Sequence, residues 1–150
     1  ASRGVAYEHN AARRAVVAAF DPTVETRPGA REALAAARDH GPVAICSNCS
    51  VPELVGRTLV RSDFERDDFD AIVTSVGCGW RKPDVRAFEV LADRLGTEMA
   101  SIHHVGDDPA TDDGIETAGG RYIDIAETPL TELATHLESK QASLDPEVEP

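Results

Sequence analysis

The sequence has few lysines, few aromatic residues and few cysteines. Its 15 basic residues are nearly all arginines, with Lys82 and Lys140 as the lysines, and 27 acidic residues outnumber them, giving a formal net charge of −12. A surface that binds nucleic acid has to be basic where it meets phosphate, so this charge argues against a nucleic-acid-binding protein. The excess of acid and of arginine over lysine suits a halophilic protein, which we state as a hypothesis.

Long apolar runs, a signal-peptide pattern and a disulfide framework are also missing. No run reaches the length of a membrane span, and three cysteines, an odd number, do not form the scaffold of a small secreted protein. With 150 residues, of which 41% are apolar, the chain is large enough for one domain with its own core. We therefore expect a soluble, cytoplasmic domain without membrane contacts. It begins with Ala1 rather than Met, as a processed or incomplete polypeptide does.

Segments with helical and with strand-like patterns alternate along the chain. Short apolar runs predict strands at residues 43–46, 71–74, 102–105 and 121–125, and the continuous run at 43–46 predicts burial on both faces. Helices are predicted at 11–20, 28–40, 51–60, 84–95, 109–118 and 130–137. This order predicts an α/β, Rossmann-like three-layer domain with a parallel sheet. We expect 1–27 to be a helical arm or cap remnant, 28–139 the core and 140–150 a flexible tail.

Polar residues follow three of the predicted strands. Ser47 and Asn48 follow the first, Lys82 lies in the loop after the second, and the aspartate-rich segment 106–113 follows the third. Because ligands of such folds bind where the carboxyl ends of parallel strands meet, we expect these residues to converge at one rim. Carboxylates beside a lysine suit Mg²⁺ next to a phosphoryl group.

The residue types at this rim predict individual roles. We expect Lys82, the Ser47 hydroxyl and the Asn48 backbone N–H to bind phosphoryl oxygens, and Asp107 to bind the metal. Asp107 comes directly after the strand, and for this residue a role in chemistry is a better interpretation than a structural role at the helix start. For the nearby Asp108 and Asp113, a role in chemistry and a structural role, as N-caps and favourable charges at a helix start, fit equally well.

Three spaced motifs resemble those of a known family. Ser47 and Asn48 after an apolar strand, Lys82 within 81–84, and the segment from Gly106 to Asp112 resemble the second, third and fourth motifs of the haloacid dehalogenase-like hydrolases. The likeness extends from about residue 27 to about residue 137. The acids of the fourth motif look like those of the phosphatase branch, because the dehalogenases proper replace them.

The resemblance implies a Mg²⁺-dependent hydrolase with a core of this family's fold. It implies that the enzyme removes phosphate from a small phosphorylated metabolite through a phosphoaspartyl intermediate. Ser47 and Lys82 would hold the phosphoryl group, Asp107 and Asp108 would bind Mg²⁺, and Asp112 would order the metal site or Lys82.

The first motif of the family is missing. That motif, Asp-x-Asp after an apolar strand, carries the nucleophile, and it does not occur before Ser47. Asp21 is a poor candidate, because the residues before it look helical and Thr23 replaces the second acid. We instead expect the nucleophile on a strand upstream of Ala1. Two alternatives stay open: a non-catalytic phosphate- or metal-binding module and, with less support, a receiver-type signalling domain.

The remaining candidates fit packing better than ligand binding. Cysteine at the end of a buried strand behaves as a small apolar residue, and a fourth zinc ligand at suitable spacing is missing. Two neighbouring histidines in a strand face opposite sides, and we expect both to be packed. A tryptophan before the lysine either lines the site or packs over the loop. These candidates are Cys46, Cys49, Cys78, His103, His104 and Trp80.

Overall fold

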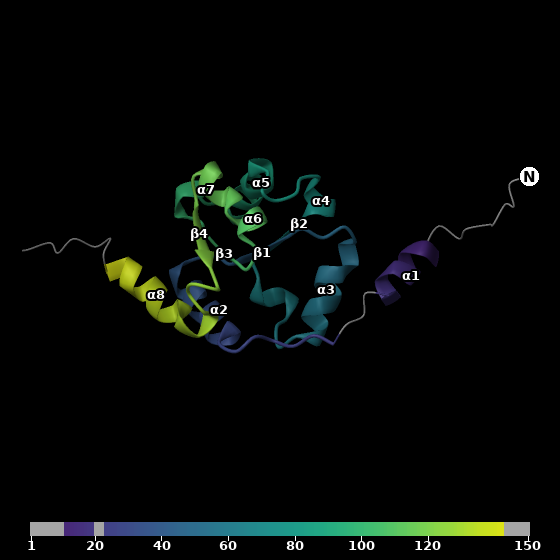
Figure 1. The fold of residues 1–150 in the computed structure, drawn as a ribbon, viewed down its shortest axis with the longest axis horizontal. Helices are drawn as coiled ribbons and strands as arrows, with labels where there is room; N and C mark the ends of the chain where they lie inside the picture. The colour runs from purple at the N-terminus through teal and green to yellow at the C-terminus, as the bar shows by residue number, and fades with distance from the viewer. Residues whose placement is uncertain (1–10, 20–22, 143–150) are drawn as a thin grey trace, which may run out of the picture.

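The computed structural model describes residues 11–19 and 23–142 (Figure 1). In chain order, its elements are α1 (Ala11–Ala19), α2 (Ala30–His40), β1 (Ala44–Ser47), α3 (Pro52–Arg61), η1 (Arg66–Asp68), β2 (Ala71–Thr74), α4 (Ser75–Cys78), α5 (Val85–Leu95), η2 (Met99–Ser101), β3 (His103–Gly106), α6 (Pro109–Asp112), α7 (Gly114–Ala118), β4 (Arg121–Asp124) and α8 (Leu130–Ala142). Among the helices of these residues, none has the length and apolar character needed to cross a membrane.

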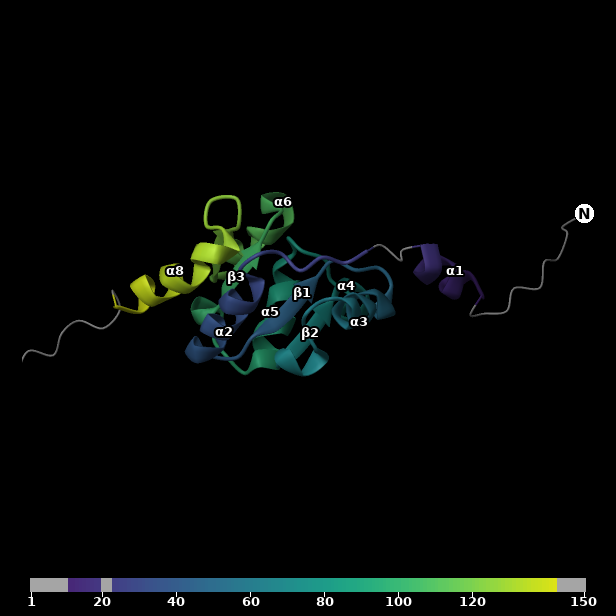
Figure 2. The same ribbon diagram turned by 90° about the horizontal axis from the view of Figure 1, so that it is seen from below.

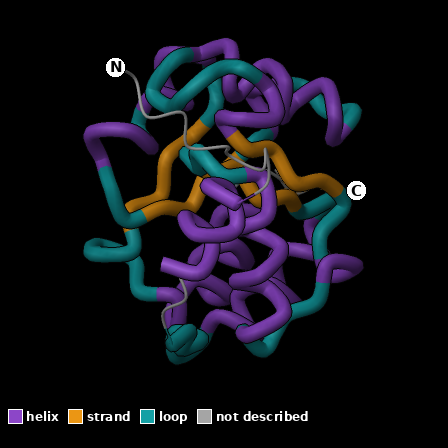
Figure 3. Tube along the Cα trace, turned by 90° about the vertical axis from the view of Figure 1, so that its right-hand side faces the viewer, coloured by secondary structure: helices purple, strands orange, loops and turns teal. Residues whose placement is uncertain are grey.

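The predicted alternation of helices and strands is confirmed, and the strands pair in parallel. Ile45 of β1 lies opposite Ile72 of β2, and Val105 of β3 lies opposite Ile123 of β4. Helical segments lie on both sides of the strands (Figure 3). Figure 2 shows α2 and α8 together at one end and α1 at the other. The molecule therefore has the α/β, Rossmann-like architecture that the sequence indicates.

In the part of the chain that the structure describes, the strands form two two-stranded sheets rather than one continuous sheet. In Figure 1 they follow one another across the molecule in the order β4, β3, β1, β2. The inner edges of the two sheets, which do not pair with each other, therefore belong to β3 and β1. The carbonyls of Ile102 and Gly106 accept hydrogen bonds from β4 and the residue after it, at 2.9 and 3.0 Å. Because peptide groups of alternate residues point to opposite edges, those of His103 and Val105 point away from β4.

The prediction that residues 43–46 form a strand buried on both faces is wrong. The strand is shifted by one residue, to Ala44–Ser47, and each of its residues is only half-buried. The physical reason is that, among the described residues, β1 pairs with a strand on one edge only, β2, while α5 packs against the pair. With its other edge unpaired among these residues, the residues of β1 stay only half-buried, although Ala44 and Cys46 pack against the core.

Three further segments differ from the sequence-based expectation. The loop expected after β2 begins with the short helix α4, which Thr74 caps by accepting a hydrogen bond from Gly77 N–H at 3.1 Å. The helix expected at 109–118 is divided at Asp113 into α6 and α7. Helix α8 continues to Ala142, into the predicted tail, and the remainder of that tail lies outside the described residues.

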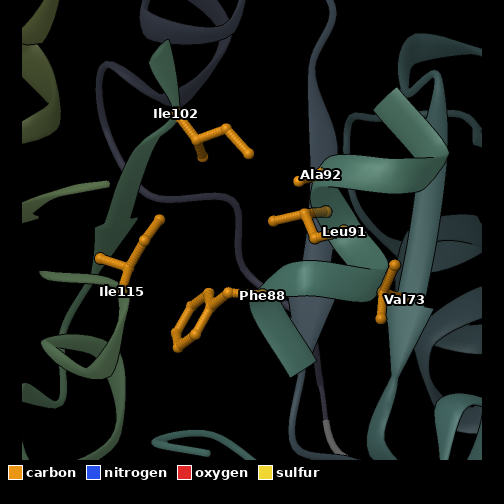
Figure 4. Packing of buried hydrophobic residues seen from close by; sticks show 6 residues of the cluster. All are labelled: Val73, Phe88, Leu91, Ala92, Ile102 and Ile115. Atoms are coloured by element: carbon orange, nitrogen blue, oxygen red, sulfur yellow. The ribbon is translucent and has the colours of Figure 1, made fainter. Parts of the chain in front are cut away.

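Helix α5 organises the core between the two sheets (Figure 4). Its apolar residues recur at helical spacing, so Phe88, Leu91 and Ala92 share one face. Six buried residues make up this cluster: Val73, Phe88, Leu91, Ala92, Ile102 and Ile115. A second cluster packs α2 and α8 on β4 through Ala33, Ile123 and Leu133. The first cluster includes Val73 of β2, and Tyr122 of β4 packs against it, so it connects the two sheets.

Candidate functional site

Lys82 connects the loops that follow three strands. Its backbone N–H donates to Asn48 Oδ1 at 2.8 Å, and Asn48 Nδ2 donates to its carbonyl at 2.9 Å. Its side-chain Nζ donates to Asp112 Oδ1 at 2.5 Å. Asn48 follows β1, Lys82 lies in the segment between β2 and α5, and Asp112 lies in α6 after β3. The structure therefore brings these three residues of the predicted rim together.

Asp112 is buried, with 3% of its surface exposed, and both of its carboxylate oxygens accept hydrogen bonds. Oδ1 bonds Lys82 and also His104 Nε2, at 3.0 Å, while Oδ2 accepts the backbone N–H of Asp108 at 3.2 Å. A Cβ on Gly106 would lie 2.0 Å from Oδ2. The last residue of β3 therefore has to be glycine for the carboxylate to turn back toward the strand.

The charges of this cluster are mutually compensated. Burial opposes ionisation of Asp112, but the hydrogen bonds from Lys82 and His104 outweigh it and leave the pKa of the carboxyl lowered. Burial lowers the pKa of His104, and the charge of Lys82 acts in the same direction against the hydrogen bond to Asp112. At neutral pH the carboxyl of Asp112 is therefore ionised and the imidazole of His104 is neutral.

Asp107 is an exposed carboxylate of the rim. Its Oδ2 accepts a hydrogen bond from Arg27 at 3.2 Å, and both side chains are 63% exposed. An exposed ion pair contributes about 0–1 kcal/mol, so Arg27 leaves this carboxylate available to another cation. Mg²⁺ prefers hard oxygen ligands and needs only one or two protein carboxylates, and Asp107 fits that requirement.

A complete metal centre is not formed by the described residues alone. Within residues 11–19 and 23–142, no group of three His, Cys, Asp or Glu side chains could hold a metal ion. Mg²⁺ at Asp107 would therefore take its other ligands from water, from the substrate or from residues outside the described part.

Asp108 caps α6, as one of its two sequence-based interpretations requires. Its Oδ1 accepts from Ala110 N–H and its Oδ2 from Thr111 Oγ1, both at 3.2 Å. Metal binding by Asp108 stays a prediction. The exposed Asp113 makes no side-chain cap bond at the start of α7, so the capping interpretation fails for this residue.

Ser47 ends β1 and is half-buried, so it lies at the carboxyl end of the strand as expected. Its carbonyl accepts the N–H of Cys49 at 3.0 Å. The side chain of the neighbouring Asn48 holds the backbone of Lys82, a role that the sequence did not predict. The phosphate contacts expected for both residues stay predictions.

A family model for haloacid dehalogenase-like hydrolases matches residues 2–119, which include β1, β2, β3 and the loops that hold Asn48, Lys82 and Asp112. The chain belongs to the haloacid dehalogenase-like hydrolases. No protein with a curated description matches the sequence.

Solved structures resemble this haloacid dehalogenase-like hydrolase. A HAD phosphatase from Thermococcus onnurineus is 26% identical, with a TM-score of 0.59, over 66% of this chain and 46% of that one. The chain thus spans less than half the length of that phosphatase. An uncharacterized protein from Corynebacterium glutamicum is 19% identical, with a TM-score of 0.59, over 85% of this chain and 93% of that one. At that identity the second likeness concerns the fold alone.

The cysteines of this hydrolase are free and offer no zinc site within the described residues. Burial raises the pKa of Cys46 to about 11, which keeps its thiol protonated. Cys49 is buried, and its Sγ donates to the carbonyl of Val51 at 3.0 Å. The Sγ of Cys78 donates to the carbonyl of Trp80 at 3.3 Å. These contacts agree with packing roles.

The remaining candidates divide between packed and exposed positions. His104 is packed as expected, whereas His103 is exposed, so the expectation that both are packed is wrong for His103. Side chains of neighbouring strand residues point to opposite faces, and on the face of His103 the packing against α2 and α8 includes Val105 but leaves His103, the first residue of β3, exposed. Trp80 is 37% exposed and stacks with Arg86, whose guanidinium lies 3.5 Å from the ring centroid.

Two further residues of the site were missed by sequence reasoning. Arg27 reaches Asp107 across 80 positions of sequence, and no local pattern signals such a contact. His104 gave a usable signal, because it lies two positions before Gly106 and therefore on the same face of the strand. A buried polar side chain next to an expected carboxylate requires a hydrogen-bond partner, and Asp112 provides it.

Proposed function

We propose that this hydrolase is a Mg²⁺-dependent phosphatase that acts on a small phosphate monoester through a phosphoaspartyl intermediate. The observation that carries the proposal is the chain of contacts from Asn48 through Lys82 to Asp112, which fixes one ammonium group at the carboxyl ends of the strands. A preorganised cation beside the carboxylate of Asp107 suits a phosphoryl group and its metal. The likeness to the Thermococcus phosphatase supports the same class.

In this proposal the rim residues divide the work. Lys82 bonds Asp112 with one N–H and donates the others to phosphoryl oxygens, together with the Ser47 hydroxyl and the Asn48 backbone N–H. Asp112 holds Lys82, because both of its oxygens are already engaged. Mg²⁺ held by Asp107, with Asp108 as a second candidate ligand, would neutralise phosphoryl charge.

We place the nucleophilic aspartate upstream of this chain, on a strand between β1 and β3. The inner edges of these strands do not pair with each other, and β1 is half-exposed. The carboxyl end of a parallel strand inserted there would lie beside Lys82. Its carboxylate attacks phosphorus and the bond to the alcohol oxygen breaks, while the second acid of the same Asp-x-Asp motif gives that oxygen a proton so that it leaves as the alcohol. Water, losing a proton to the same acid, then attacks the acyl phosphate, which releases phosphate and restores the carboxylate. Residues 28–139 would be the catalytic core and 1–27 the end of a cap.

The test is to supply the missing strand as a synthetic peptide. The peptide has a continuous run of apolar residues followed by Asp-x-Asp, and a control peptide has Asn at the first acidic position. With Mg²⁺ and p-nitrophenyl phosphate, we expect hydrolysis from the chain with the Asp peptide and none with the Asn peptide. Binding of inorganic phosphate by the chain, without turnover in any mixture, would instead favour a phosphate-binding module. Turnover by the chain alone would place the nucleophile within it. If the chain neither binds phosphate nor turns over substrate in any mixture, the proposal is refuted.

Replacing Asp107 with asparagine is expected to weaken Mg²⁺ binding by at least about tenfold, because a neutral amide replaces a hard anionic ligand. The matched control is Asp113→Asn, which changes an exposed carboxylate of the same segment and should leave the affinity unchanged. Isothermal titration with Mg²⁺ measures both, and thermal unfolding without Mg²⁺ should be the same for all three proteins. Equal Mg²⁺ affinity in wild type and Asp107→Asn would remove Asp107 from the metal site.

A further inference from the structure

His104 lies at the buried centre of the rim, although neither the sequence nor the proposed function gives it a role. It is 9% exposed, and its Nε2 lies 3.0 Å from Asp112 Oδ1 and 3.4 Å from Lys82 Nζ. Its ring meets Phe88 edge-to-face at 5.4 Å between centroids, and Tyr122 lies at 6.5 Å. The imidazole of His104 thus contacts the Lys82–Asp112 pair, while aromatic side chains pack around the imidazole.

The chemistry of the two neighbours decides which imidazole nitrogen carries the hydrogen. The ammonium of Lys82 can only donate, and the ionised carboxylate of Asp112 can only accept. A bare nitrogen lone pair at 3.0 Å from a carboxylate oxygen would be repelled by it, so Nε2 has to carry the hydrogen. His104 therefore donates Nε2–H to Asp112 Oδ1.

We propose that His104 is a positioning residue that orients the ammonium of Lys82 through Asp112. The bond from His104 fixes Oδ1, and the backbone N–H of Asp108 fixes Oδ2, so the carboxylate cannot rotate. The ammonium of Lys82 then donates to Oδ1 from one fixed direction, which also fixes the directions of its remaining N–H groups. Only the last step, in which those groups hold phosphate, rests on the proposed function.

Two variants separate this role from simple packing. His104→Gln keeps a side-chain N–H donor but loses the ring, whereas His104→Phe keeps the ring but loses the donor. The full chain is labelled with ¹⁵N-lysine, and its ammonium signals belong to Lys82 and to the exposed Lys140, which is the internal control. We expect the Lys82 signal to stay sharp in wild type and His104→Gln, and to broaden in His104→Phe.

Phosphate affinity provides the second readout, with inorganic phosphate as the titrant. We expect affinity to fall about tenfold in His104→Phe, as is usual when a supporting hydrogen bond is lost, and to change less than about twofold in His104→Gln. The opposite order, equal losses in both, or no change in either would overturn the proposal. If the ammonium signals behave as expected while wild type binds no phosphate, the positioning role stands and the proposed function fails.

A measurement on wild type alone covers the case in which a variant does not fold. Long-range ¹H–¹⁵N spectra identify which imidazole nitrogen carries the hydrogen. We expect the Nε2–H tautomer for His104 at neutral pH. The Nδ1–H tautomer, with a bare Nε2 toward Asp112, would overturn the proposal by itself.

Discussion

Lys82→Met is expected to abolish measurable phosphate binding and to destabilise the protein strongly. Methionine has a similar length but no charge, so phosphoryl oxygens lose their cation. The change also leaves Asp112, which is 3% exposed, without the ammonium that now bonds it at 2.5 Å. Removing one partner of a buried ion pair costs about 3–5 kcal/mol. Calorimetric titration with inorganic phosphate measures the first effect, and urea unfolding measures the second.

A double variant separates the two effects of this substitution. Lys82→Met with Asp112→Asn removes both charges, so it should recover much of the lost free energy of unfolding while phosphate binding stays absent. Lys140→Met is the single-residue control, because Lys140 is exposed in α8, and it should change neither quantity. Phosphate affinity equal to that of wild type in Lys82→Met would show that Lys82 does not bind the phosphoryl group.

Gly114→Ala is expected to destabilise the protein by about 3 kcal/mol, at the upper end of the usual cost of overpacking. A Cβ at Gly114 would lie 2.4 Å from the carbonyl oxygen of Pro83 and 2.7 Å from its Cα. That backbone has little freedom to move, because Asn48 holds the carbonyl and N–H of Lys82 just before it. The substitution should therefore also weaken phosphate binding, measured by the same titration.

Gly56→Ala is the matched control for this steric argument. Gly56 lies in the middle of α3, and a Cβ there would meet nothing within 4 Å. Alanine is the better helix former by about 0.8–1.0 kcal/mol, so this variant should be more stable than wild type in urea unfolding. A Gly114→Ala variant as stable as wild type would mean that the contact between α7 and Pro83 is loose.

The elements of the fold were predictable because their signals are local. Helices α2 and α5 have apolar residues at helical spacing and a clear beginning and end, such as the Asp84 cap and Gly96 at φ 63° for α5. Sheet continuity was not predictable, since an apolar run such as that of β1 indicates a strand but not whether both edges have partners. The half-exposure of β1 depends on this long-range pairing and therefore could not be predicted from its sequence.

The site was predictable where residue types follow strands. Lys82, Asn48 and Asp112 converge because parallel strands end on the same side, a rule of topology that needs no coordinates. The contacts of His104 and Arg27 depend instead on side-chain direction and on segments far apart in sequence. The sequence therefore indicates which loops meet, and the structure shows which atoms do.

The way Asn48 holds its neighbour has a consequence for how such a rim can change during evolution. Asn48 bonds the peptide N–H and carbonyl of position 82, groups that this position keeps through most substitutions. The hydrogen bonds that place residue 82 at the rim therefore do not depend on the side chain that acts there. A mutation can replace the cation while the loop keeps its path, so new specificities can arise here without a new fold.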